Sequence, residues 1–295
     1  MRIFLTGATG FIGTAVTREL IAAGHQVLGL TRSEQGAHHL AALGAEAHYG
    51  DVNDLDSLRR GISQADGVIH TAFNHDFSTF LANCESDRQV IEAMGRELAG
   101  SSRPLIITSG VALGALQPNT LASEDNFNPD HANPRKASEL GGIKAAEQGA
   151  SVSVVRLSQV HNPIKQGLIT PLVELALQKG VSAYVEEGQN CWSAVHISDA
   201  ARLYVLALEK NATNSRYNAV AEPAIPMKTL AETLGRVLNL PVKCLAAHEA
   251  AEHFGWMNIF VTHDMSASSD LTQQRSGWKP TGPSLIADLE QMPIK

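Results

Sequence analysis

The feature that most constrains the fold is a glycine-rich segment close to the N-terminus, Thr6-Gly7-Ala8-Thr9-Gly10-Phe11-Ile12-Gly13. It follows a short apolar run, residues 2–6, which is typical of a strand buried on both faces of a sheet. Residues 11–23 are expected to form a helix that stops at Gly24. A strand, a glycine turn and a helix in this order predict a site for a pyrophosphate group.

The three glycines of this turn have separate expected tasks. Gly7 allows the tight turn, Gly10 lets the backbone approach a pyrophosphate, and Gly13 lets the helix pack closely on the strand. We therefore expect a bound dinucleotide to contact a set of turn residues, namely Gly7, Thr9, Gly10, Phe11, Ile12 and Gly13. The alternative is an ordinary turn between a strand and a helix.

The end of the second predicted strand, residues 26–31, indicates which dinucleotide is bound. Sites that prefer NAD usually carry Asp or Glu here, on the ribose hydroxyls. This sequence has Thr31, Arg32 and Ser33 instead. The guanidinium of Arg32 can clamp a 2′-phosphate and Ser33 can add a hydrogen bond, so we expect NADP(H) rather than NAD. The alternative is a surface arginine that binds no ligand.

A carboxylate and an apolar side chain follow the third predicted strand, residues 46–49. Asp51 can accept a hydrogen bond from the adenine amino group, and Val52 can lie against the adenine ring. Alternatively, Asp51 only caps the helix that begins near Asp54.

Short β-rich runs alternate with helical stretches in the first half of the chain. The sequence predicts strands at residues 2–6, 26–31, 46–49, 67–72, 104–109 and 151–157. It predicts helices at residues 11–23, 35–43, 54–62, 76–99 and 134–148, the last of them after an N-cap at Asn133 and a first helical residue at Pro134. This alternation predicts an α/β fold with a doubly wound parallel sheet and helices on both faces.

The second half of the chain is less regular. Helices are expected at residues 167–179, 198–209, 227–238, 248–255 and 284–289, and short strands at 193–197 and 216–219. We expect a dinucleotide-binding Rossmann domain from residues 1–160 with a returned segment, 192–220. Residues 161–191 and 221–295 are expected to form a smaller substrate-binding part. Substrate would lie between the two parts, at the carboxyl ends of the strands.

Composition narrows the classes of partner. Of 295 residues 44% are hydrophobic, the net charge is −7, and no block of five Lys and Arg occurs, so we expect no nucleic-acid partner. No apolar run reaches the roughly 18 residues of a membrane span, and the N-terminus lacks a secretory signal pattern. Cys84, Cys191 and Cys244 lack zinc-binding spacing. We expect a cytoplasmic protein with reduced thiols, no metal and a small-molecule substrate, and we leave a homodimer open.

Six segments, in order, resemble the short-chain dehydrogenase/reductase superfamily in its extended or atypical branch, which includes NAD-dependent epimerase/dehydratase and dihydroflavonol-reductase-like proteins. They are TGATGFIG at 6–13, VIHTAF at 68–73, ITSGVALG at 107–114, VVRLSQVHNP at 154–163, WSAVHISDAARLYVLALE at 192–209 and RSGWKPTGPSL at 275–285. The resemblance covers nearly the whole chain. It implies a cofactor wall formed by Thr71, Ala72 and Phe73, and nicotinamide contacts from Leu157 and Val160.

The family's chemistry uses a Ser or Thr that orients the substrate oxygen, a Tyr that exchanges a proton with it, and a Lys four residues later that holds the ribose. Ser109 lies five residues before Gly114, as the family spacing requires, and the resemblance implies that it contacts substrate and cofactor. The alternative is a polar strand end. None of the four tyrosines precedes a lysine by four residues, so the usual Tyr-x-x-x-Lys pair is missing.

The family's frame, aligned on Arg156, places its glutamate at Glu139, its lysine at Arg135 and its tyrosine at His131. Arg135 can hold the nicotinamide ribose as a cation, but it cannot exchange a proton near neutral pH. His131 can transfer a proton, and the alternative is an exposed loop histidine. Lys144 does not fit this frame and is expected to be a solvated helix residue.

Other side chains offer a proton donor in place of the tyrosine. His75 and Asp76 follow the fourth predicted strand and so lie beside the cofactor, although Asp76 is also a good helix N-cap. On the substrate side the candidates are Tyr184 with Trp192 and His196, for which pocket walls or core packing is the alternative. A further candidate is His161, near the end of the segment at 154–163 that follows the sixth predicted strand.

These features favour an NADP(H)-dependent oxidoreductase that acts on a carbonyl or hydroxyl of a small metabolite. One alternative is a sugar-nucleotide epimerase or dehydratase, which also needs a proton-transferring base. The other is a protein that binds NADP without catalysis and acts as a sensor or regulator, which the missing tyrosine favours.

Overall fold

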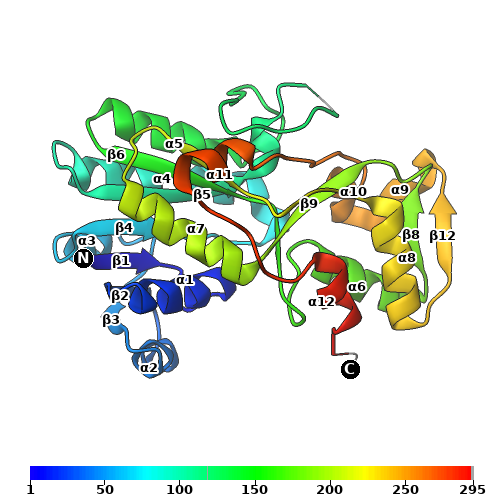
Figure 1. Cartoon of the computed structure of the whole chain (residues 1–295), viewed down its shortest axis with the longest axis horizontal. Helices are drawn as coiled ribbons and strands as arrows, with labels where there is room; N and C mark the ends of the chain where they lie inside the picture. The colour runs from blue at the N-terminus through cyan, green and yellow to red at the C-terminus, as the bar shows by residue number, and fades with distance from the viewer. Residues whose placement is uncertain (118, 294–295) are drawn as a thin grey trace.

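A seven-stranded parallel sheet forms the body of the protein (Figure 1), and the computed structural model describes residues 1–117 and 119–293. The strand order is β10-β6-β5-β4-β1-β2-β3, as in a doubly wound α/β fold. The strands are β1 (Arg2–Thr6), β2 (Gln26–Thr31), β3 (Glu46–Tyr49), β4 (Gly67–His70), β5 (Pro104–Gly110), β6 (Ser151–Leu157) and β10 (Arg216–Ala219). The predicted fold class is therefore confirmed.

Helices cover both faces of this sheet (Figure 1). On one face lie α1 (Phe11–Ala22), α2 (Glu34–Ala42) and α7 (Ile197–Lys210), and on the other lie α3 (Leu55–Ile62), α4 (Phe80–Leu98) and α5 (Lys136–Glu147). Successive strand residues alternate between the two faces: Ile3 and Leu5 belong to the apolar core beneath α1 and α7, and Phe4 to the core beneath α3 and α4. Both faces of β1 are buried, as its continuous apolar run predicts.

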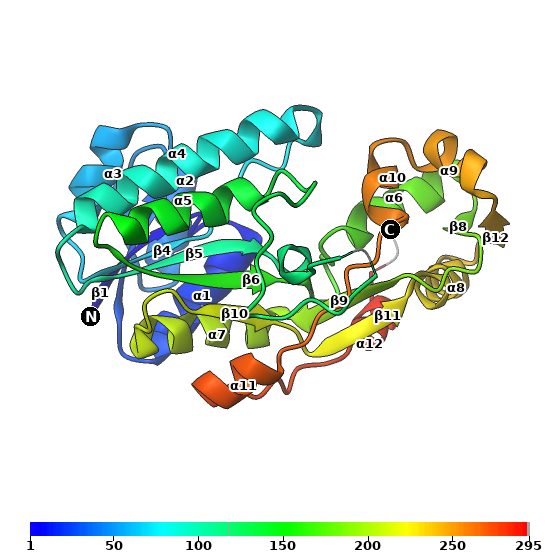
Figure 2. The same ribbon diagram turned by 90° about the horizontal axis from the view of Figure 1, so that it is seen from above.

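A smaller lobe lies beyond the carboxyl ends of the strands (Figure 2). It contains α6 (Ile169–Lys179), α8 (Met227–Leu238), α9 (Ala247–Phe254), the 3-10 turn η3 (Gly255–Met257), α10 (Asn258–Val261) and α12 (Leu285–Glu290). Two small sheets join these helices: β7 (Gln159–His161), β9 (Cys191–His196) and β11 (Glu222–Pro226) form one, and β8 (Ser182–Val185) and β12 (Val242–Leu245) the other. The lobe has its own core around Trp192, Leu230 and Phe254.

Some elements differ from the sequence-based expectation. Helix α5 begins at Lys136 rather than at Pro134, because Asn133 Oδ1 accepts a hydrogen bond from Arg135 N (2.9 Å) and holds these residues in a turn. The 76–99 helix is preceded by a 3-10 turn, η1 (Phe77–Thr79). The short elements β7, β8, β11, β12, α10 and α11 (Asp270–Ser276) were not predicted. Among the described residues no helix is long and apolar enough to cross a membrane.

Helices α4 and α5 pack closely at a small-residue contact. A Cβ placed on Gly95 would lie 2.2 Å from Ala145 Cβ, closer than two carbon atoms approach. Gly95 thus lets the two helices that carry the candidate site approach each other.

We predict that Gly95→Ala lowers the free energy of unfolding, by about 1 kcal/mol net, because overpacking outweighs the gain in helix propensity. In an Ala145→Gly background the same change should cost less, with a coupling of about 1 kcal/mol in a double-mutant cycle measured by urea denaturation. Additive effects of the two substitutions would contradict the contact.

Candidate functional site

The glycine turn has the geometry of a phosphate cradle. Gly7 has a φ of 68°, and its carbonyl accepts a hydrogen bond from Gly10 N (2.9 Å). A Cβ on Gly13 would lie 2.0 Å from Gly7 O, and one on Gly7 would lie 2.7 Å from Ala72 N. Both positions therefore require glycine. Gly10 is exposed and no side chain caps α1 at this residue, so the backbone can approach a ligand.

A groove of ≈ 560 Å³ begins at this turn. Its volume is in the range of ligand pockets in proteins. The glycine turn and α1 contribute Thr9, Gly10, Phe11 and Thr14 to its lining. Ser33 and Gln35, from the end of β2 and the start of α2, also line the groove, as do Asn162 and Ile197. Ile12, the remaining turn residue, is partly exposed beside them.

An exposed cation, Arg32, directly follows the end of β2. The Arg32 side chain is 80% exposed, and its Nη1 lies 3.6 Å from Asp51 Oδ2. Thr31 is buried, and Ser33 Oγ caps α2 by accepting a hydrogen bond from Gly36 N (3.1 Å). A surface ion pair of this length contributes little, so Arg32 can exchange Asp51 for another anion.

The helix after β3 is capped by Asp54 and not by Asp51. Asp54 caps α3, since its Oδ1 accepts hydrogen bonds from Asp56 N and Ser57 N (both 3.1 Å). Asp51 instead accepts from Asn53 N (2.8 Å) in a local turn, so it does not cap α3, and its Oδ2 faces Arg32. Val52 packs at the edge of the core beneath α3 and α4.

The residues after β4 lie against the glycine turn. Thr71 Oγ1 donates a hydrogen bond to Thr6 O (2.8 Å), and Ala72 N lies where a Gly7 side chain would be. Phe73 extends this segment, and the Arg135 guanidinium lies over its ring, 3.8 Å from the centroid. The structure therefore brings the predicted wall residues together with the turn and with Arg135.

Ser109 belongs to a buried network around Glu139. Ser109 Oγ donates to Glu139 Oε1 (2.6 Å), Arg156 donates to both carboxylate oxygens (2.7 and 2.9 Å), and Arg216 Nε donates to Oε2 (2.8 Å). Burial raises the pKa of the Glu139 carboxyl, but the hydrogen bonds from Arg156, Ser109 and Arg216 outweigh it and lower the pKa. The alignment frame is consistent with this contact between Glu139 and Arg156. The Ser109 proton points inward to Glu139.

Arg135 is a fixed cation. Its Nη1 donates to Asp87 Oδ2 (2.7 Å) and to Ser138 Oγ (2.6 Å), and its Nη2 donates to Thr108 O (3.1 Å). Asp87 also accepts from His70 Nε2 (3.0 Å). Burial raises the pKa of Asp87, but Arg135, His70 and Ser138 together lower it to about 2.

Asp87 was not among the site residues predicted from the sequence. A signal was present, because Asp87 lies three residues after Cys84 and three before Val90, on the apolar face of the predicted helix, and all three are buried. A carboxylate on such a face requires a buried partner.

His131 lies outside the helix register. It precedes α5 in a turn, its backbone N–H donates to Asn128 O (3.1 Å), and its Nδ1 accepts from Asn133 N (3.0 Å). Burial lowers the pKa of His131, with smaller contributions from Lys136 and His263. In the described part of the chain no hydrogen bond joins it to Ser109 or Arg135.

His75 lies beside Arg135. His75 is an exposed residue, and its ring meets the Phe73 ring edge-on, with the centroids 5.2 Å apart. The Arg135 guanidinium lies over the same Phe73 ring. Partial burial lowers the pKa of His75, and the charges of Arg135 and Lys165 lower it further. Asp76 instead caps the 3-10 turn η1 by accepting from Ser78 N (2.9 Å).

The other predicted residues lie in packing positions. Leu157 is partly buried, and Val160 lies in the core with Val155 and Val195. Trp192 is fully buried in the smaller lobe, and Tyr184 is partly buried in β8.

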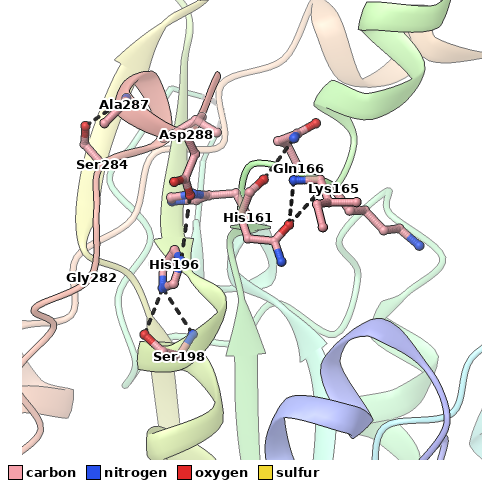
Figure 3. A network of polar contacts seen from close by, with 12 residues as sticks. His161, Lys165, Gln166, His196, Ser198, Gly282, Ser284, Ala287 and Asp288 are labelled. Atoms are coloured by element: carbon pink, nitrogen blue, oxygen red, sulfur yellow. Dashed lines mark hydrogen bonds and ion pairs between the residues drawn. The ribbon is translucent and has the colours of Figure 1, made fainter. Parts of the chain in front are cut away.

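His161 and His196 meet Asp288 of α12 (Figure 3). His161 Nδ1 donates to Asp288 Oδ2 (2.6 Å), and His196 Nε2 lies 3.8 Å from the same oxygen. His161 is fully buried, and its Nε2 has no hydrogen-bond partner among the residues that the structure describes and lies 3.9 Å from Glu222 Oε2. These contacts fasten α12 to β7 and β9. Residues 1–117 and 119–293 contain no group of three His, Cys, Asp or Glu placed to hold a metal.

We predict that Asp87→Asn lowers the free energy of unfolding by about 3 kcal/mol near neutral pH, because it leaves the Arg135 charge buried without its partner. The folded-state pKa of Asp87 is depressed, so its contribution is present above its ordinary value of 3.8 and is lost as the pH falls toward about 2. Urea denaturation across this range should show less acid dependence in the variant.

The matched control is Glu85→Gln on the same helix, which removes an exposed ion pair with Arg88. It should change stability by less than about 1 kcal/mol. Equal losses of unfolding free energy in the two variants would contradict a larger contribution from the Asp87–Arg135 pair than from the exposed ion pair.

Relatives of known sequence cover nearly the whole chain. The profile of the NAD dependent epimerase/dehydratase family matches residues 3–220. An uncharacterized protein of Schizosaccharomyces pombe is 48% identical over 291 residues, and one of Saccharomyces cerevisiae is 40% identical over 293 residues, with 98% of each chain covered in both cases. The 2-alkyl-3-oxoalkanoate reductase of Stenotrophomonas maltophilia is 26% identical over 257 residues, which is 82% of this chain and 77% of that protein.

Solved structures share the fold. The human epimerase family protein SDR39U1 with NADPH superposes with a TM-score of 0.75 at 21% identity, covering 99% of each chain. The dTDP-glucose 4,6-dehydratase DesIV of Streptomyces venezuelae, solved with NAD, gives 0.76 at 20% identity, covering 99% of this chain and 95% of that one. Since the family profile runs from β1 through the glycine turn to β10, the protein belongs to the NAD dependent epimerase/dehydratase family.

Proposed function

We propose that the protein is an NADP(H)-dependent oxidoreductase that reduces a carbonyl, or oxidises the matching hydroxyl, of a small molecule. The observation that carries the proposal is Arg32, whose side chain is 80% exposed at the end of β2, next to the glycine turn and with no carboxylate at residues 31–33. The name of the Stenotrophomonas relative, a reductase, and the NADPH in the human structure support it.

The residues in and around the glycine turn and the groove fit a dinucleotide. Gly7 and Gly13 leave no room for a side chain, and exposed Gly10 lets backbone N–H groups of the turn bind a pyrophosphate. Arg32 and Ser33 would bind the 2′-phosphate, and Asp51 and Val52 the adenine. On the other side of the turn, Thr71, Ala72 and Phe73 would form a wall for the nicotinamide half.

The nicotinamide group supplies hydride transfer when it is bound. The chain's own task is then to orient the substrate and to deliver a proton to its oxygen. Arg135 stabilises negative charge near the Phe73 ring but cannot release a proton. We assign proton delivery to His75, whose ring is accessible and meets the same Phe73 ring. Substrate would bind between the sheet and the smaller lobe, which we propose as the substrate-binding part.

A second candidate function is a sensor that binds NADP without turnover. One observation favours it. Two residues predicted at the family's catalytic positions, Ser109 and Arg135, make hydrogen bonds inside the protein, Ser109 to Glu139 and Arg135 to Asp87. Purified protein distinguishes the two functions. NADPH oxidation with any member of a panel of aldehydes and ketones supports the enzyme, and tight NADPH binding without turnover on every member supports the sensor.

We predict that Arg32→Ala weakens NADPH binding about tenfold to a hundredfold, because it removes charge-assisted hydrogen bonds to the 2′-phosphate. NADH, which lacks this phosphate, serves as the matched ligand, and its affinity should not change. Titrations of the reduced cofactors followed by their fluorescence measure both affinities. A wild-type protein that binds NADH as tightly as NADPH, or a variant that loses both equally, would refute the NADP(H) preference.

We predict that carbonyl reduction falls as the pH rises through the pKa of His75, which lies below its ordinary value of 6.5. Reduction consumes a proton, so the imidazolium is the active form. His75→Gln should lower kcat about a hundredfold and remove this limb of the pH profile. His131→Gln should leave the limb in place. If instead His131→Gln removes it, the donor is His131.

A further inference from the structure

Five aromatic side chains from the two lobes form a continuous cluster, here called the aromatic wall: Phe73, Phe77, Phe80, Trp256 and Phe260, of which Phe260 is only 8% exposed. Phe77 stacks on Trp256 with ring centroids 4.4 Å apart and an interplanar angle of 15°. Phe77 also contacts Phe80 (5.3 Å) and Phe260 (5.7 Å), and Phe80 contacts Phe73 (6.1 Å). The wall thus joins the β4–α4 connection to η3 and α10, which belong to different lobes in Figure 2.

The wall begins at the candidate site and reaches solvent. At its inner end the Arg135 guanidinium lies 3.8 Å from the centroid of the Phe73 ring. At its outer end Trp256 is 46% exposed and the neighbouring Ile259 is 57% exposed. Trp192 and Trp278, in contrast, are at most 1% exposed. Exposed aromatic surface that continues from a site is typical of a ligand-binding surface rather than of a core.

The wall itself offers no cation to an anionic ligand. No wall residue is charged, and three of the five Arg135 N–H donors are directed to Asp87, Ser138 and Thr108. His75 borders the wall, and its lowered pKa keeps it largely uncharged near neutral pH. The charges of Arg135 and Lys165 act at the inner end of the wall, beside His75. A diphosphate placed on the outer part of the wall, on Phe77 and Trp256, would contact no charged wall residue, whereas a neutral flat ring would stack there.

We propose that the aromatic wall binds a planar aromatic group of the substrate, and that the substrates are neutral aldehydes or ketones that carry an aromatic ring rather than sugar nucleotides. This inference rests on the proposed function and names its substrate class. The aryl ring extends the stack of Phe77 and Trp256, and the carbonyl is directed toward Phe73, His75 and Arg135 at the inner end.

Calorimetric titration of the NADP⁺-loaded protein tests this proposal. The probes are benzylacetone, an open-chain ketone with the same number of carbon atoms, and UDP-glucose. The open-chain ketone is at least as apolar as benzylacetone, so it separates ring stacking from simple hydrophobicity. We expect benzylacetone to bind at least about fivefold more tightly than the open-chain ketone, as stacking on one aromatic pair allows, and UDP-glucose not to bind.

Variants localise the effect. Phe77→Leu keeps apolar volume but removes a ring, and it should weaken benzylacetone binding about fivefold. Trp256→Phe keeps a ring and should weaken it less. Leu177→Ala changes an exposed apolar residue of the same lobe that lies on α6, outside the wall, and should leave the affinity unchanged. The tryptophan emission of the wild-type protein should change with benzylacetone and not in Trp256→Phe, because the other two tryptophans are buried.

Three results would overturn the proposal. Equal affinity for the two ketones, unaffected by Phe77→Leu, means that the wall does not recognise rings. Binding of UDP-glucose without binding of benzylacetone means that the substrate class is that of sugar nucleotides. Binding of neither ketone refutes the substrate class alone if NADPH still binds with dependence on Arg32, and it refutes the proposed function as well if NADPH does not bind.

Discussion

The arrangement of the site depends on the buried ion pair between Asp87 and Arg135. Asp87 comes from α4, and Arg135 from the residue just before α5. His70 at the end of β4 bonds Asp87, and its Nδ1 lies 2.7 Å from Thr6 Oγ1, the residue before the glycine turn. One network therefore spans β1, β4, α4 and α5. Because a buried charge without a partner is very costly, these elements can shift only together.

This network contains Arg135, the residue that the sequence predicts at the family's lysine position. Arg135 is a cation whose hydrogen bonds are directed to Asp87, Ser138 and the Thr108 carbonyl. The Ser109 hydroxyl similarly donates to Glu139. The donors of Arg135 and Ser109 thus serve internal contacts. Under the proposed function, the exposed His75 beside the Phe73 ring is the group left to meet a substrate.

The sequence predicts those parts of the protein that depend on local pattern. The strands of the main sheet follow from apolar runs. The glycine turn follows from the glycines of the sequence, since backbone atoms lie where side chains at Gly7 and Gly13 would be. The contact between Asp87 and Arg135 joins residues 48 positions apart and leaves no local signal beyond an acid on an apolar helix face. The short strands β7, β8, β11 and β12 were missed because partners distant in sequence, rather than their own periodicity, stabilise them.

Arginine rather than lysine at residue 135 connects the ionic network to the aromatic wall. A lysine ammonium is a compact charge with no face, whereas a guanidinium is planar and can donate in its plane while it stacks on a ring. Arg135 does both: its edge bonds Asp87 and Thr108, and its face covers Phe73. These contacts hold the Arg135 charge close to the candidate site, and the guanidinium does not release a proton near neutral pH. In the proposed reaction, a site built this way would polarise an oxygen beside an apolar ring and would obtain its proton from another residue.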